Sequence, residues 1–223
     1  MKLGVQLGWL AAVALATAQA WAQSGAGATA PTAHSVVDDA TRRVMAVVEE
    51  AQAYAEGDPE RYYRQVQEIL DPVIDFRGFA RGVMGPYASS ERYRSLDEAG
   101  RAELREQLDR FTEVMRLGLV RTYSKGLLAY SGSRIVLDKP DPMAADETFV
   151  SVQQLIYTGE AEPYVILYQM GRDRSGDWKL RNVIIESVNL GEIYRNQFEA
   201  AAREQNGDLD AVIDNWTTVE VDT

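Results

Sequence analysis

The side chains of this sequence that could carry out chemistry are mainly tyrosines and carboxylates, because histidine and cysteine are scarce. The chain contains one histidine, His34, and no cysteine. This composition argues against histidine-based catalytic triads, thiol chemistry and the common transition-metal sites, and we expect no metal and no cofactor. A proton-transfer site that pairs Tyr123 or Tyr168 with Asp75 remains open, although nothing in the spacing of these residues requires it.

Three basic residues are candidates for binding an anionic phosphate group, namely Arg81, Arg121 and Lys125. Guanidinium and ammonium groups make charge-assisted hydrogen bonds to phosphate oxygens. The alternative, which is the more common role of such charges, is the solvated face of a helix. The sequence leaves both roles open.

The chain as a whole is acidic, with a formal net charge of −11 at neutral pH. Binding to nucleic acid requires clustered lysine and arginine, so we expect no nucleic-acid partner. For the same reason we do not expect permanent adhesion to an anionic lipid surface. The simpler alternative is that the acidic charge only keeps the protein soluble.

The first 22 residues predict a cleaved secretory signal. They contain a charged start, a mostly apolar run over residues 3–20 and the small-x-small sequence Ala20-Trp21-Ala22. An uncleaved membrane anchor is the alternative, although the run is short for a clean span. No cysteine follows that could carry a lipid, so we expect an exported, freely soluble protein in the bacterial periplasm. Residues 23–35, rich in small residues, are predicted to be a flexible leader.

Apolar residues at helical spacing predict several helices in the first part of the mature chain. Asp58-Pro59 and Asp71-Pro72 each place an N-cap before a proline, which is typical of a helix start. Residues 95–98 have the spacing of a capping box, and a long apolar stripe follows them. Residues 87–94 are polar and are predicted to form a loop. The predicted helices cover residues 36–55, a short stretch from residue 59, residues 71–84 and residues 98–130.

After residue 132 the apolar period changes to two, which is typical of strands. Short connections imply an antiparallel meander, and a helix over residues 190–203 and a short helix over residues 209–216 follow it. We therefore expect an α+β fold, with N-terminal helices and one long helix on a curved four-stranded antiparallel sheet and a C-terminal helix. A single domain should span residues 36–216, with residues 217–223 as a tail. The predicted strands are residues 134–139, 148–157, 164–172 and 178–188.

The last two predicted strands are apolar on both faces, whereas an antiparallel sheet with one solvated face should be half polar. Helices that cover both faces explain this pattern, and so does an internal apolar cavity between helices and sheet. Periodicity does not separate a filled core from a lined cavity, so each candidate lining residue has a place in the core as its alternative. The candidates are Phe79, Val83, Met84, Phe111, Met115, Leu119, Tyr123, Leu127, Val150, Val152, Ile166, Tyr168, Leu180, Val183 and Ile185.

Four segments of the chain are similar, in the same order, to the motifs of one known family. They read DFRGFARGVMGPY over residues 75–87, RTYSKGLLAY over 121–130, WKLRNVIIESV over 178–188 and YRNQF over 194–198. Together they resemble the MlaC family, the toluene-tolerance or ABC-transporter auxiliary proteins. The likeness extends from about residue 36 to residue 216.

The resemblance implies an α+β protein that holds the acyl chains of a phospholipid between its helices and a curved sheet. It implies a periplasmic carrier that shuttles lipid between an outer-membrane lipoprotein–porin complex and an inner-membrane MCE–ABC transporter complex, which maintains outer-membrane lipid asymmetry. We expect a monomer and no catalysis. The family's tryptophan after the first motif is replaced by Ala88, and Asn182, Ser187 and Asn189 replace its Asp, Gly and Ser. These changes leave ligand identity and partner choice open.

Two other functional classes remain open. One is an enzyme for a small apolar ligand that uses the tyrosine–aspartate pair, and the other is a non-catalytic docking module of the cell envelope with a filled core. A carboxylate with a strongly raised pKa inside the pocket would favour the enzyme.

Overall fold

The computed structural model describes residues 30–129, 133–139, 146–159 and 162–218. Residues 31–223 form one compact unit, and residues 1–30 are a separate one. The predicted signal, most of the predicted leader and part of the predicted tail lie outside the described residues. Within the described part of the chain, no helix combines the length and the apolar character needed to cross a membrane.

The first three helices begin where the sequence supplies a side-chain cap. Helix α1 (Ala33–Ala51) follows Thr32, α2 (Pro59–Leu70) follows Asp58, and α3 (Phe76–Met84) follows Asp75. In each case the cap side chain accepts a hydrogen bond from a backbone N–H of the first turn, which would otherwise have no partner. The aspartate–proline sequence therefore predicts the start of α2 correctly. The predicted start of the third helix at residue 71 is wrong, because the residues after it form turns and a short bridge before Asp75 caps α3.

Two other predicted boundaries also need correction. Residues 33–35 were expected in the flexible leader, but they form the first turn of α1, and the His34 ring donates a hydrogen bond from Nε2 to the main-chain oxygen of Asp138 at 2.7 Å. The loop expected over residues 87–94 is largely helical, with the 3-10 helix η1 (Gly85–Ala88) and α4 (Ser90–Ser95). Helix α4 forms because Ser89 caps it by accepting from the backbone N–H of Arg92.

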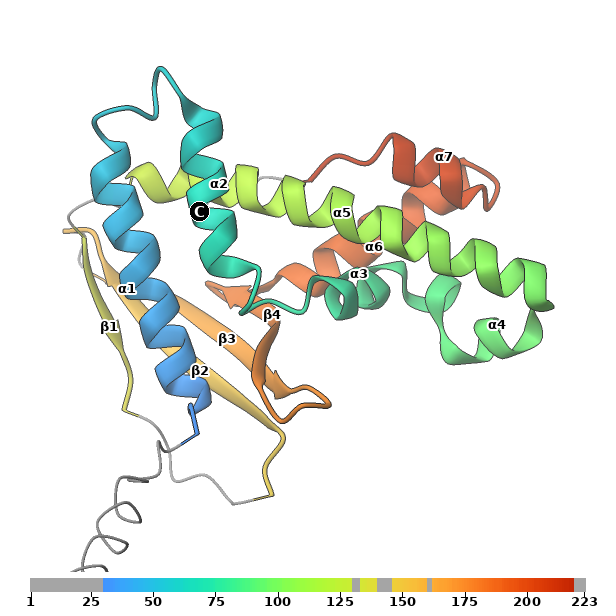
Figure 1. Cartoon of the computed structure of the whole chain (residues 1–223), viewed down its shortest axis with the longest axis horizontal. Helices are drawn as coiled ribbons and strands as arrows, with labels where there is room; N and C mark the ends of the chain where they lie inside the picture. Colours follow the sequence, from blue (N-terminus) through green and yellow to red (C-terminus); the bar gives the residue numbers. More distant parts are fainter. Residues whose placement is uncertain (1–29, 130–132, 140–145, 160–161, 219–223) are drawn as a thin grey trace, which may run out of the picture. The chain divides into compact units, whose positions relative to one another are not determined.

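The long helix predicted by the apolar stripe is α5 (Glu98–Ala129), which crosses the whole helical part of the structure (Figure 1). Its first half packs against α3, α6 (Leu190–Glu204) and α7 (Leu209–Asp214) in a large helical core that includes Phe111, Tyr194 and Phe198. Its second half contributes Val120 to a second cluster with α1 and α2. The apolar stripe of α5 is therefore buried in two different environments.

The sheet is antiparallel throughout, and its order is β1-β2-β3-β4-β5. The α+β class is confirmed, but the expected number of four strands is wrong. The predicted last strand folds into a hairpin, because Glu186 and Ser187 both have positive φ, 49° and 70°, as a tight two-residue turn requires. The strands are β1 (Arg134–Leu137), β2 (Phe149–Tyr157), β3 (Tyr164–Arg172), β4 (Trp178–Ile185) and β5 (Val188–Asn189).

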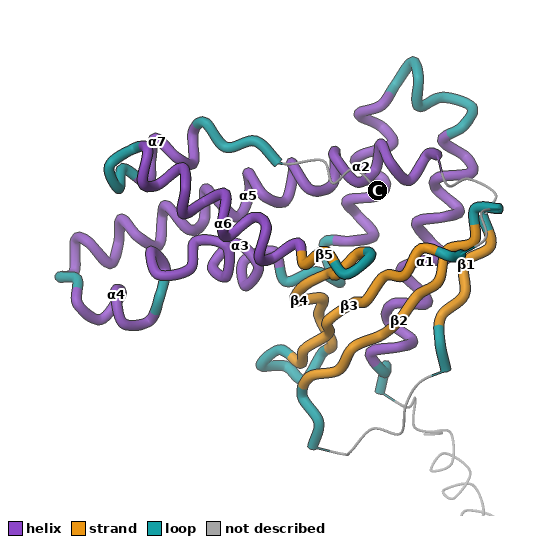
Figure 2. The backbone as a smooth tube through the Cα atoms, turned by 180° about the vertical axis from the view of Figure 1, so that it is seen from behind, coloured by secondary structure: helices purple, strands orange, loops and turns teal. Residues whose placement is uncertain are grey.

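Helix α1 lies across one face of β1 to β3, and the view from behind shows these strands in front of it (Figures 1 and 2). Its first turns pack onto the sheet in a third cluster, called here the sheet cluster. The sheet cluster consists of Ala33, Val37, Val152, Met170 and Trp178. On the opposite face of the sheet, Leu155, Val165 and Leu167 are only half-buried. One explanation for the apolar strands was that helices cover both faces of the sheet. The described part of the structure does not show this arrangement.

Candidate functional site

A cavity of about 750 Å³ lies between the helices and the inner face of the sheet. Helices α1 and α2, the first turn of α3 and the second half of α5 form one wall, and β1 to β4 form the other. Most of the lining side chains are apolar, and a size of several hundred Å³ is typical of pockets for small organic ligands. The arrangement therefore suits an apolar guest of some length.

The structure brings a majority of the predicted lining residues together around this cavity. On the sheet side, the pairs Ile166–Ile185, Tyr168–Val183 and Met170–Leu180 stand opposite each other across β3 and β4 and point to the same face. The predicted residues that line the cavity are Phe79, Leu119, Tyr123, Leu127, Ile166, Tyr168, Leu180, Val183 and Ile185.

The other predicted lining residues lie elsewhere. Val83, Met84, Phe111 and Met115 are at most 1% exposed and are packed into the helical core. Val152 belongs to the sheet cluster, and Val150 packs against it. The reason on the helix side is that only the second half of α5 faces the sheet, whereas the first half of the same stripe faces α3 and α6.

We assign the mouth of the cavity to the last turns of α5, because the exposed part of the lining lies there. Among the cavity-lining residues that the structure describes, Lys125 and Gly126 are the exposed ones. The Lys125 ammonium has no hydrogen-bond or ion-pair partner among the described residues. A Cβ atom added at Gly126 would meet no other atom within 4 Å. Among the described residues, the mouth therefore carries one positive charge without a partner, that of Lys125, and the space beside Gly126 is open.

The other two phosphate candidates are placed differently. Arg121 binds both carboxylate oxygens of Glu60, at 2.9 and 3.0 Å, so its charge is already compensated on the protein surface. Arg81 is exposed on α3 and does not line the cavity. Of the three candidates, the structure thus places Lys125 at the cavity.

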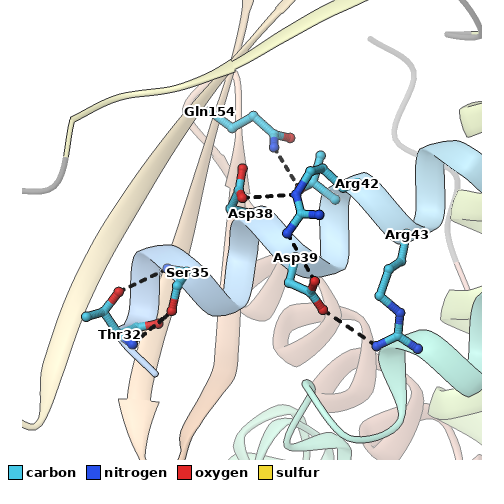
Figure 3. A network of polar contacts seen from close by, with 8 residues as sticks. Thr32, Ser35, Asp38, Asp39, Arg42, Arg43 and Gln154 are labelled. Carbon is cyan, nitrogen blue, oxygen red and sulfur yellow. Dashed lines mark hydrogen bonds and ion pairs between the residues drawn. The ribbon is translucent and has the colours of Figure 1, made fainter. Parts of the chain in front are cut away.

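One chain of polar contacts links the sheet wall of this mostly apolar cavity to α1. The Tyr168 hydroxyl on β3 donates to Gln154 Oε1 on β2 at 2.8 Å, and Gln154 Nε2 donates to Thr41 Oγ1 on α1 at 2.9 Å. Figure 3 shows Gln154 reaching from the sheet to α1. Burial raises the pKa of Tyr168, so its hydroxyl keeps its proton at physiological pH. We call this chain the polar bridge.

The cavity wall also contains residues that the sequence did not single out. Helices α1 and α2 supply Val37, Ala40, Thr41, Val44, Met45, Val66 and Leu70. The helical stripe of α1 was visible in the sequence, but a stripe shows which side of a helix is buried and does not show against what. Gln154 carried no such signal, because a glutamine within an alternating strand is normally a solvated residue.

The tyrosine–aspartate pair considered for proton transfer is not assembled. Asp75 accepts a hydrogen bond from the Gly78 backbone N–H at 2.9 Å and forms an ion pair with Arg181. The Tyr123 hydroxyl contacts that of Tyr194 at 3.3 Å, and burial raises the pKa of Tyr123. The structure therefore gives Asp75 and the tyrosines separate, structural partners.

Comparison with known proteins identifies relatives over most of the chain. The family model described as MlaC protein matches residues 38–218. The toluene tolerance protein Ttg2D of Pseudomonas putida is 29% identical over 188 residues, which cover 84% of this chain and 80% of that protein. A solved structure of a phospholipid-binding protein from Ralstonia solanacearum, in complex with a phospholipid, matches with a TM-score of 0.67 and 22% identity. That match covers 82% of this chain and 94% of the other, and it establishes a shared fold.

Proposed function

Because this chain belongs to the MlaC family, we propose that it is a periplasmic phospholipid carrier that holds acyl chains in its apolar cavity. The observation that carries the proposal is the cavity of about 750 Å³ with its apolar walls. The Ralstonia solanacearum protein that shares this fold was solved with a phospholipid bound, which supports the choice of ligand.

The energetics of lipid transfer explain why such a cavity is needed. Burying one methylene group is worth about 0.8 kcal/mol, so moving a lipid with about 30 of them through water would cost on the order of 20 kcal/mol. A carrier must replace most of that contact with apolar side chains. Ile166, Val183 and Ile185 on the sheet and Leu119 and Leu127 on α5 provide such contact.

The charged group of the lipid belongs at the mouth. Phosphate is strongly hydrated and would lose that hydration among apolar side chains. Lys125 stands at the exposed rim of the cavity and has no partner there among the described residues. The phosphate would therefore lie beside Lys125, with the acyl chains directed inward.

The proposal includes transport of the bound lipid between the two membranes. Export by the signal over residues 1–22 would leave a soluble monomer that moves between the two membranes. It would receive or deliver lipid at an outer-membrane lipoprotein–porin complex and at an inner-membrane MCE–ABC transporter complex. The acidic net charge of −11 supports a protein that leaves anionic membranes readily.

Carriage requires no catalytic group, and the family points to a binding or transport protein rather than to an enzyme. The separate partners of Asp75 and the tyrosines agree with that role. Val83, Met84, Phe111 and Met115 would support the wall from behind instead of touching the lipid.

Native mass spectrometry of protein purified from cells, followed by lipid extraction, tests the proposal. We expect phospholipid at about one molecule per chain and uptake from vesicles by the delipidated protein. A folded protein that contains no lipid and takes up none would refute the carrier function.

A pair of adjacent substitutions provides a matched control. Ile166→Trp adds a large side chain inside the cavity and should abolish uptake. Leu167→Trp makes a similar change one residue away, on the opposite half-buried face of β3, and should leave uptake unchanged. Equal loss in both variants would show that the cavity is not the lipid site.

A further inference from the structure

The outer face of the sheet has a row of apolar side chains that no described helix covers. Val136, Leu155 and Val165 lie side by side across β1, β2 and β3, because Val136 pairs with Leu155 and Leu155 pairs with Val165. All three are only half-buried, and Figure 2 shows these strands in front of the helices. The cavity does not explain why these positions are apolar, because it lies on the other face. We call these three residues the outer row.

The outer row lies at the mouth end of the sheet. Leu155 and Val165 are next in sequence to Ile156 and Tyr164, which line the cavity from the inner face of the same strand ends. Both views show the last turns of α5, to which we assign the mouth, at this end of the sheet (Figures 1 and 2). A surface that contacts the outer row is therefore close to the point where lipid would enter and leave.

The charges around the outer row are positive, although the chain as a whole is acidic. Arg134 and Lys179 point outward from the described strands β1 to β4, and none of the outward residues of these strands is an aspartate or glutamate. Arg134 stacks on Tyr157, with its guanidinium carbon 3.7 Å from the ring centroid, and it forms no ion pair with any residue that the structure describes. The carboxylate of Glu186, on the turn after β4, accepts a hydrogen bond from the backbone N–H of Val165. This face can therefore approach a phosphate group without repulsion from carboxylates on its own strands.

The interface of a phospholipid bilayer matches this chemistry. Apolar side chains enter the boundary of the acyl chains, and tyrosine favours the zone between acyl chains and head groups. Arginine covers apolar surface with its methylene groups and reaches the phosphates with its guanidinium group. Because the net charge of the whole chain is −11, such a contact should be weak and reversible on membranes that contain anionic lipid.

We infer that the outer row, together with Arg134 and Tyr157, docks transiently on the surface of a phospholipid bilayer and brings the mouth of the cavity to it. This inference rests on the proposed lipid-carrier function, because it adds the surface at which that carrier meets its lipid. An uncovered apolar patch on a soluble protein is typical of an interaction site, and the absence of carboxylates favours a surface of phosphate groups.

A fluorescent label on the outer face tests the docking. The chain contains no cysteine, so Gln153→Cys provides a single labelling site on the same side of β2 as Leu155. The mature protein, saturated with phospholipid beforehand and labelled with an environment-sensitive dye, is mixed with phosphatidylcholine vesicles at about 0.15 M salt, which screens long-range repulsion. The emission should shift to shorter wavelength, and spin-labelled lipid in the vesicles should quench it. Arg64→Cys, exposed on α2, is the control and should show neither effect.

Two substitutions of the same chemistry measure the contribution of the outer row. Leu155→Glu places a charge in the row and should weaken partition onto phosphatidylcholine vesicles about tenfold, as measured by flotation. Leu117→Glu makes the same change on α5, at a residue that is 44% exposed and does not line the cavity, and should leave the partition unchanged. The label at position 153 does not depend on the folding of Leu155→Glu.

The outcomes separate this inference from the carrier function. No change at position 153 when vesicles are added, or equal changes at positions 153 and 64, overturns docking on lipid and leaves the outer row to a protein partner. A change at position 153 that follows protein concentration without vesicles assigns the row to a second copy of the chain and also overturns it, as does equal loss of partition in both glutamate variants. Absence of lipid from the purified protein, with no uptake, refutes the carrier function whatever the label reports.

Discussion

Leu180 and Val183 point to the same face of β4 although three positions separate them. Their partners on β3, Met170 and Tyr168, are two positions apart, and the register shifts between Gln169 and Met170. The additional residue is Arg181, which makes a β-bulge. Because of it, Leu180, Val183 and Ile185 all line the cavity, and Arg181 reaches Asp75 at the cap of α3.

Lys125→Glu should weaken uptake of anionic phospholipid roughly threefold to tenfold at low salt. An exposed charge pair is worth about 0.2–1 kcal/mol, and a reversal replaces attraction by repulsion. Equilibrium transfer of phospholipid from vesicles at low and high salt measures this loss of uptake. The loss should become smaller at high salt, because salt screens the charge. Arg64→Glu, exposed on α2 away from the cavity, is the control. Equal effects of both variants would mean that only the net charge matters.

Gly126→Leu should slow lipid uptake while stabilising the protein. The position is exposed at the mouth with open space around it, and replacing a helical glycine gains up to about 1 kcal/mol. Gly82→Leu on α3 is the matched control. An added Cβ there also meets nothing within 4 Å, and Gly82 does not line the cavity. Both melting temperatures should rise, and stopped-flow uptake should slow only for Gly126→Leu. Unchanged uptake in that variant would place the entrance elsewhere.

Asp75→Ala should lower the free energy of unfolding by about 2 kcal/mol, because it removes both the cap of α3 and the partner of Arg181. Asp58→Ala removes an exposed cap alone and should cost about 1 kcal/mol. Urea denaturation measures the difference. The folded Asp75→Ala protein should still bind lipid, whereas loss of binding in a stably folded variant would revive a direct role for this carboxylate.

Stability should fall between about pH 10 and pH 12 in a manner that depends on Tyr62. Burial raises the pKa of Tyr62 from 10.0 to about 12, and its hydroxyl donates to the Ser124 carbonyl at 2.9 Å. The unfolded chain releases this proton near pH 10 while the folded protein keeps it. Its contribution is therefore complete below pH 10 and is lost as pH rises through 12.

Tyr62→Phe tests this titration. It should cost about 1 kcal/mol at neutral pH and reduce the alkaline slope by up to about 1.4 kcal/mol per pH unit. The buried Tyr168 and Tyr194, whose pKa values are also raised by burial, should retain the rest of the slope. Denaturation curves at pH 7 and pH 11 provide the measurement, and parallel losses in wild type and variant would contradict the assignment.

The sequence by itself determined the local features whose causes lie within a few residues. The Asp58-Pro59 cap, the long stripe of α5 and the alternation of the strands each predicted their element, because caps and periodicity act over one or two turns. The ordered motifs also identified the MlaC family, which the family match over residues 38–218 confirms.

Only the tertiary structure decided what each apolar surface faces. Phe111 and Leu119 belong to one stripe, yet Phe111 is packed in the helical core and Leu119 lines the cavity. The sequence also did not predict three local features of the structure. They are the bulge at Arg181, the positive φ of Glu186 and Ser187, and the position of Gln154 beside Thr41. The physical reason is that these depend on partners far apart in the chain, while periodicity records only that a face is apolar.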